Sequence, residues 1–133
     1  MTLSNAFLRL AVIAALVGMI WGNVMGATHD HSTASAHAHL NLLGWVSMSI
    51  YGLFYRVVPA AAAGLLPRVH FWLNVLTVVA MVPALGVVLT GIAPLMPIAG
   101  PVLALTGLTM LISMLLFAVI VFRNTSNKAA IAA

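Results

Sequence analysis

Residues 102–122 read VLALTGLTMLISMLLFAVIVF, a run without a single charged side chain. A helix needs about 20 apolar residues to cross roughly 30 Å of bilayer hydrocarbon, because each residue advances it by about 1.5 Å. This stretch is therefore long enough to be a transmembrane helix. Outward from it, the chain contains further apolar stretches, and we predict spans at about residues 7–25, 37–58, 69–89 and 101–122.

The composition of the whole chain agrees with a membrane location. Of its 133 residues, 64% are hydrophobic and 5% are charged, and the mean hydropathy is +1.20. Soluble globular domains carry about 25% charged residues. Short connections at residues 28–33, 59–67 and 90–101 separate the spans, so neighbouring helices should be antiparallel. We therefore predict an all-α integral membrane protein, with residues 1–133 forming one domain of four transmembrane helices.

The positive charges predict how this domain is oriented. Cytoplasmic loops carry an excess of Lys and Arg over outer loops. All five cations fall on one side of the predicted spans: Arg9, Arg56, Arg68, Arg123 and Lys128. Both termini should therefore be cytoplasmic, and the connections 28–33 and 90–101 should lie outside. The expected location is the inner membrane of a bacterium, with the spans in contact with lipid.

An alternative interpretation of the N-terminal residues stays open. A signal peptide has a positively charged start, an apolar run and small residues at its cleavage site. Residues 1–36 imitate this pattern through Arg9, the apolar run and the pair Ser35-Ala36. Cleavage there would leave an odd number of spans, so we favour a retained first helix.

Composition also excludes several kinds of function. The chain has no cysteine, which excludes disulfides, iron–sulfur clusters and haem attached covalently through a C-x-x-C-H motif. Asp30 is the only acidic side chain, so a paired-acid mechanism has no second partner within one chain. The five cations are too dispersed to form a nucleic-acid-binding patch. A bound cofactor must therefore be held by His, Met or Asp.

Four of the five histidines lie close together in the sequence, at positions 29, 31, 37 and 39. Polar side chains are costly at bilayer depth and usually have a task there. His37 and His39 open the second span, and a helix turns about 100° per residue, so their imidazoles should point about 200° apart. They cannot chelate one ion together. Such a pair can instead offer one axial ligand to each of two planar cofactors, and haem iron fits that geometry.

The outer connection holds a second candidate site. His29 and His31 flank Asp30 there, and these three side chains could bind copper or zinc. The same triplet could equally be a solvated loop that binds nothing. The sequence leaves both interpretations open.

Part of the sequence resembles a known family. The run Ala36-His37-Ala38-His39 is followed by Ile50, Gly52, Phe54-Tyr55 and Pro59, and then by His70-Phe71-Trp72. This combination resembles the tenth and eleventh transmembrane helices of subunit I of the haem–copper oxidase superfamily, which includes cytochrome c oxidases and nitric oxide reductases. The resemblance covers about 40 residues of the second and third spans.

The resemblance implies roles for individual residues. His37 matches the ligand of the high-spin haem, His39 matches the ligand of the low-spin haem, and His70 matches a residue that is not a metal ligand. We therefore expect non-covalent haem b, and we expect His70 to be a structural histidine at the membrane interface. The chain resembles a single four-helix arc of the larger subunit. The family's copper ligands and redox tyrosine have no counterpart in it.

These observations lead to one preferred hypothesis and two alternatives. The preferred function is electron transfer by a small membrane haem protein, with a redox partner that the sequence does not identify. The first alternative is an oxygen or nitric oxide reductase with an open iron position, and the second is an outer-face copper- or zinc-binding membrane protein without haem. An absorption spectrum distinguishes the metal-binding protein, which would lack the haem bands, from the two haem-dependent functions.

The expected assembly is a homotrimer with haems between subunits. His39 of one chain and His37 of the next would hold the same iron, and such head-to-tail contacts usually close into a ring. Three copies would reproduce the three arcs of the family. Alternatively, His29 or His31 could cap the iron within one chain.

Overall fold

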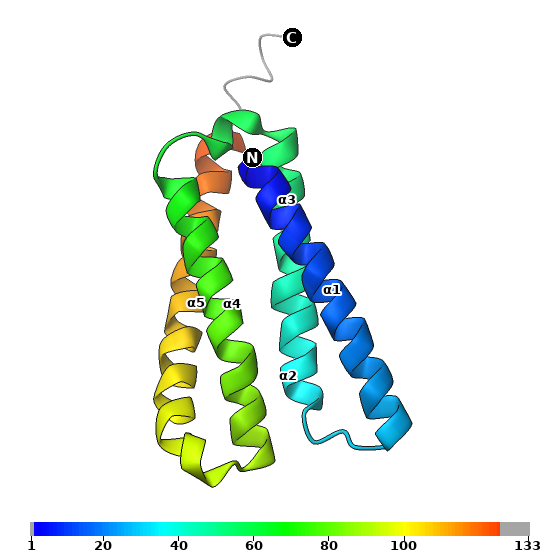
Figure 1. Ribbon diagram of the computed structural model, residues 1–133. Coiled ribbons are helices and arrows are strands. Elements are labelled where there is room, and N and C mark those ends of the chain that lie inside the picture. The colour runs from blue at the N-terminus through cyan, green and yellow to red at the C-terminus, as the bar shows by residue number, and fades with distance from the viewer. Residues whose placement is uncertain (1, 126–133) are drawn as a thin grey trace.

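The computed structural model describes residues 2–125, and every regular element in this part of the chain is a helix (Figure 1). Three of the helices are long: α1 spans Leu3–Thr28, α4 spans Leu66–Thr90 and α5 spans Met96–Thr125. Each, by length and composition, could cross a membrane, α5 together with the short turn that precedes it. The prediction of an all-α protein is confirmed, and the three long apolar helices are of the kind found in integral membrane proteins.

The second rod of the bundle, in chain order, runs from Ala34 to Val57 in three consecutive pieces. It begins as α2 (Ala34–His39), continues as the π-helix η1 (Leu40–Ser47) and ends as α3 (Met48–Val57). A π-helix bonds each residue to the fifth one before it, and such segments often occur at functional sites. Here the π-helix begins directly after the two histidines that open the rod.

The connections are short and helical in part. The turn η2 (Pro59–Ala62) joins α3 to α4, and η3 (Ala93–Leu95) joins α4 to α5. The predicted connection at residues 90–101 is too long, because α5 already begins at Met96 and carries Pro101 inside it. Pro97 fits the first turn of this helix, where a missing backbone N–H needs no intrahelical partner.

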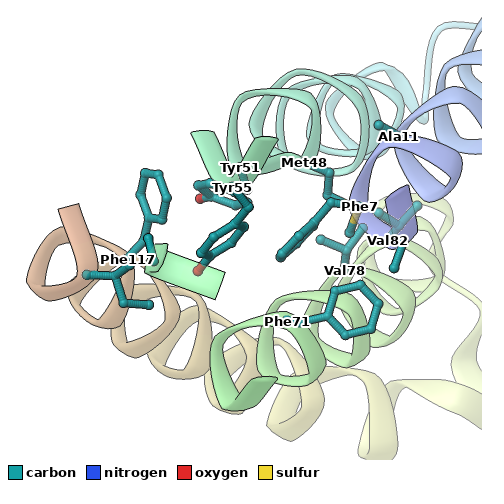
Figure 2. Packing of buried hydrophobic residues seen from close by; sticks show 12 residues of the cluster. Phe7, Ala11, Met48, Tyr51, Tyr55, Phe71, Val78, Val82 and Phe117 are labelled. Carbon is teal, nitrogen blue, oxygen red and sulfur yellow. The ribbon is translucent and has the colours of Figure 1, made fainter. Parts of the chain in front are cut away.

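The four rods form two antiparallel pairs (Figure 1). Helix α1 packs against the rod α2–η1–α3, and α4 packs against α5. The pairs meet at an aromatic core, which Figure 2 shows from close by. Phe7 lies at its centre, 4.8 Å from Phe71 and 5.5 Å from Tyr51 between ring centroids, and Tyr51 lies 4.5 Å from Phe117.

Both described chain ends and the turn η2 lie at one end of the bundle, which we call the inner end (Figure 1). Arg56 donates a hydrogen bond of 3.0 Å to Asn5 there, which ties α3 to the start of α1. Two further arginines lie at the same end: Arg68 near the start of α4 and Arg123 in the last turn of α5. Lys128, the fifth predicted cytoplasmic cation, lies outside the described residues. The opposite end, with residues 29–33 and η3, is the outer end.

Candidate functional site

His39 is held in an orientation that suits a metal ligand. Its Nδ1 lies 2.8 Å from the backbone oxygen of Ser35, one turn earlier in α2, and the ring is partly exposed. A carbonyl oxygen can only accept a hydrogen bond, so Nδ1 of His39 carries the hydrogen and is the donor. The lone pair is then on Nε2. Histidines that ligate metals are commonly fixed in this way, with the other ring nitrogen bonded to a carbonyl or carboxylate.

His37 makes a different set of contacts, toward α1. Its ring lies edge-on to the Trp21 indole, with 6.1 Å between centroids. The amide nitrogen of Asn41 lies 3.2 Å from its Nε2 and 3.4 Å from its Nδ1, and it donates a hydrogen bond of 2.9 Å to its backbone oxygen. The two imidazoles therefore have separate neighbours, as the spacing of two residues predicts. One amide fixes both the ring and the backbone of His37.

A hollow of about 700 Å³ lies beside His37, between α1 and the start of the second rod. Its floor includes Gly18, Gly22 and Gly26, which follow one another at intervals of one turn on α1. A Cβ atom added at Gly22 would lie 3.2 Å from Cε1 of His37, and one added at Gly18 would lie 2.5 Å from Oδ1 of Asn41. The first two glycines thus make room for His37 and Asn41.

Neither Asn41 nor the glycines were predicted as part of the site from the sequence. The signal that could have found them is the four-residue spacing of Gly18, Gly22 and Gly26, since glycines at that interval share one helix face and let another surface approach closely. Asn41 carries a weaker signal, as an amide one turn after His37. Both features become informative only when α1 is known to lie beside α2.

Trp21 also fixes where the second rod begins. Its Nε1 donates a 3.1 Å hydrogen bond to Oγ1 of Thr33, the residue that precedes α2. The same hydroxyl lies 3.7 Å from Sδ of Met25. The outer connection is therefore anchored to α1 immediately before the pair of histidines.

The outer triplet does not form a cluster. His29, Asp30 and His31 are exposed, and residues 2–125 contain no group of three or more His, Asp or Glu side chains placed to hold a metal ion. His29 ends α1 in the left-handed backbone region, with φ of 55°. The backbone N–H of Ser32 donates a 2.9 Å bond to Oδ1 of Asp30. This bond lowers the pKa of the Asp30 carboxyl below its usual value and keeps it ionised.

His70, which the sequence predicts to be a structural histidine at the membrane interface, lies near the inner end and is enclosed by protein. Its side chain is 0% exposed and packs inside the aromatic core, because Phe7 and Phe117 both lie within 5.4 Å of it between ring centroids. Nδ1 lies 3.0 Å from the hydroxyl of Tyr55. Tyr51 and Tyr55 are almost fully buried in the same core.

Comparison of this chain with protein-family models, with curated proteins and with solved structures finds no match. The haem–copper oxidase resemblance therefore rests on the residues of the second and third spans alone.

Proposed function

We propose that this protein is a small membrane haem protein that transfers electrons, with His37 and His39 as axial ligands of haem b. The observation that carries the proposal is the bond from Nδ1 of His39 to the Ser35 carbonyl, which leaves Nε2 as the ligating atom on a partly exposed ring. When bound, haem supplies a centre that accepts and releases one electron. The chain supplies the two imidazole ligands and a hollow beside His37.

The residues present fit a large planar group at the outer end. The hollow of about 700 Å³ falls within the range of about 300–1,000 Å³ that is usual for ligand sites. Gly22 and Gly26 present backbone rather than side chains to it, so a flat ring could approach α1 closely. Asn41 and Asn23 also line it and offer amide groups for the polar edge of such a ligand.

Placement in the membrane is part of the same proposal. The rod from Ala34 to Val57 forms the fourth transmembrane span, beside α1, α4 and α5. The inner end is cytoplasmic because it carries Arg56, Arg68 and Arg123, and the histidines then lie near the outer surface of a bacterial inner membrane. Any redox partner would act from that outer side.

The proposed assembly is a homotrimer with one haem at each subunit interface. His37 contacts α1, whereas the ring of His39 is held by its own helix, so one chain presents its two imidazoles on separate flanks of α2. A single iron can then receive His39 from one chain and His37 from the next. The resemblance to one arc of a three-arc subunit favours three copies.

The test is an absorption spectrum of the purified protein and of matched histidine variants. The wild type should show a Soret band and split α/β bands on reduction. His37→Ala and His39→Ala should each lose haem, because each removes an axial ligand, whereas the control His31→Asn alters only an exposed loop and should keep it. A wild-type protein without a Soret band, or haem retained by both alanine variants, would contradict the proposal.

Two further measurements address the alternatives. Rapid carbon monoxide binding to the reduced protein would indicate a five-coordinate iron and favour a reductase of oxygen or nitric oxide over a bis-histidine cytochrome. A colourless protein that contains stoichiometric copper or zinc, lost in a His29→Ala, His31→Ala double variant, would favour a metal-binding protein instead.

A further inference from the structure

The seam between α4 and α5 holds a group of enclosed polar side chains that plays no part in the proposed haem site. His70, Asn74 and Ser113 are all 0% exposed. Each has one side-chain atom without a hydrogen-bond partner among residues 2–125: Nε2 of His70, Oδ1 of Asn74 and Oγ of Ser113. A buried polar atom left without a partner is costly, by about 1–3 kcal/mol in proteins.

The helix register brings these three side chains to one place. The His70 ring stacks on Phe117, with 5.3 Å between centroids, and Thr77 bonds Thr109 at 2.8 Å between hydroxyl oxygens. Asn74 lies one turn after His70 and Ser113 lies one turn before Phe117. In an antiparallel pair Asn74 is therefore opposite Ser113, between these two contacts.

A further contact supports this register. The Asn74 amide nitrogen donates to Sδ of Met110, which lies at 3.7 Å and is three residues before Ser113 on α5. The amide nitrogen of Asn74 is therefore directed at α5 and already occupied, and only its oxygen needs a partner. His70 and Asn74 therefore lie one helical turn apart on α4, and Ser113 lies opposite Asn74 on α5.

The hydrogen-bonding chemistry of the three atoms is complementary to that of one water molecule. When the Tyr55 hydroxyl donates its hydrogen bond to Nδ1 of His70, the single N–H of the neutral imidazole is at Nε2. This N–H then needs an acceptor. Oδ1 of Asn74 can only accept, and Oγ of Ser113 can do either. A water molecule can accept from Nε2, donate to Oδ1 and bond Oγ, and buried waters typically make about three such bonds.

We propose that one water molecule is bound between His70, Asn74 and Ser113. With it, the Tyr55–His70 hydrogen bond continues along the α4–α5 seam toward the Thr77–Thr109 pair, and the chain holds a polar path in the inner half of the bilayer without any carboxylate. The ligand class is a small molecule that both donates and accepts hydrogen bonds. The site is independent of haem binding.

The first test uses the sign of a stability change in the purified, detergent-solubilised protein. If water bridges the three groups, Asn74→Leu and Ser113→Ala should each lower the thermal unfolding midpoint by several degrees, and the double variant should lose less than the sum, because either change dismantles one shared site. Thr90→Val is the matched control, since it removes an exposed hydroxyl that bonds only carbonyls of its own helix.

An unchanged or raised unfolding midpoint in either single variant would overturn the proposal. Without a bound water the deleted polar group would have no hydrogen-bond partner, and its removal would relieve the energetic cost of burying it. A direct bond between Asn74 and Ser113 would also lower the midpoints, so a second measurement separates it. Magnetic relaxation dispersion of water nuclei should count one fewer long-lived internal water in Asn74→Leu and in Ser113→Ala than in the wild type. An equal count would contradict the proposal.

Discussion

The inner end of the bundle encloses one histidine, whereas the outer end carries four on or near its surface. His70 is surrounded by aromatic rings and bonds Tyr55 within the same chain. His37 and His39 are partly exposed, and a hollow lies beside His37. Histidine thus contributes to packing at the inner end and stays accessible at the outer end. The inner end therefore stabilises the fold, whereas the outer end has accessible imidazoles for the proposed haem site.

The largest expected effect is at the centre of the inner end. Phe7 is 0% exposed and its ring contacts Tyr51, Tyr55, His70 and Phe71. Phe7→Ala should destabilise the protein by about 3–5 kcal/mol, because large cavities in packed cores are poorly refilled. Unfolding by a denaturing detergent measures the change. Ile20→Ala, on an exposed surface of α1, is the control and should change stability far less.

A smaller effect should follow from removing the hydrogen bond between Tyr55 and His70. Tyr55→Phe keeps the ring but deletes the hydroxyl, which leaves Nδ1 of His70 buried without a partner at a cost of about 1–3 kcal/mol. Tyr51→Phe deletes a hydroxyl that contacts the sulfur of Met114 at 3.6 Å and the side chain of Ser47, but it leaves the bond to His70 intact and should cost less. Equal losses in the two variants would show that the Tyr55–His70 bond contributes nothing specific.

Comparable or smaller changes are expected at the outer end, where glycine spacing controls the surroundings of His37. Gly18→Ala should destabilise by about 1–3 kcal/mol, because its Cβ would lie 2.5 Å from Asn41 and displace an amide that bonds His37. Gly26→Ala is the matched control, since its Cβ would meet nothing within 4 Å. It should be neutral or stabilising through better helix propensity.

The smallest effect should come from the anchor of the outer connection. Thr33→Val removes the acceptor for Trp21 Nε1 and should cost about 0.5–1.5 kcal/mol. Thr90→Val, which removes an exposed hydroxyl at the end of α4 that bonds only carbonyls of its own helix, serves as the control. Faster cleavage of residues 29–33 by added protease in Thr33→Val than in the control would show that this bond holds the connection.

Apolar runs of transmembrane length and short connections were enough to predict an all-helical bundle. The start of α5 was misjudged because prolines usually mark loops, although Pro97 is compatible with a first helical turn. The burial of His70 was missed because it depends on Phe7 and Phe117, which lie far away in the sequence. Only the packing of α1 on α2 relates the glycines to His37.

Native mass spectrometry in detergent tests most directly whether His37 and His39 of different chains hold the same iron, as we propose. The proposed function predicts a trimer that carries three haems, and loss of those haems in His39→Ala. A monomer that retains one bis-histidine haem would contradict the shared ligation, and a protein without haem in any oligomeric state would contradict the haem assignment itself.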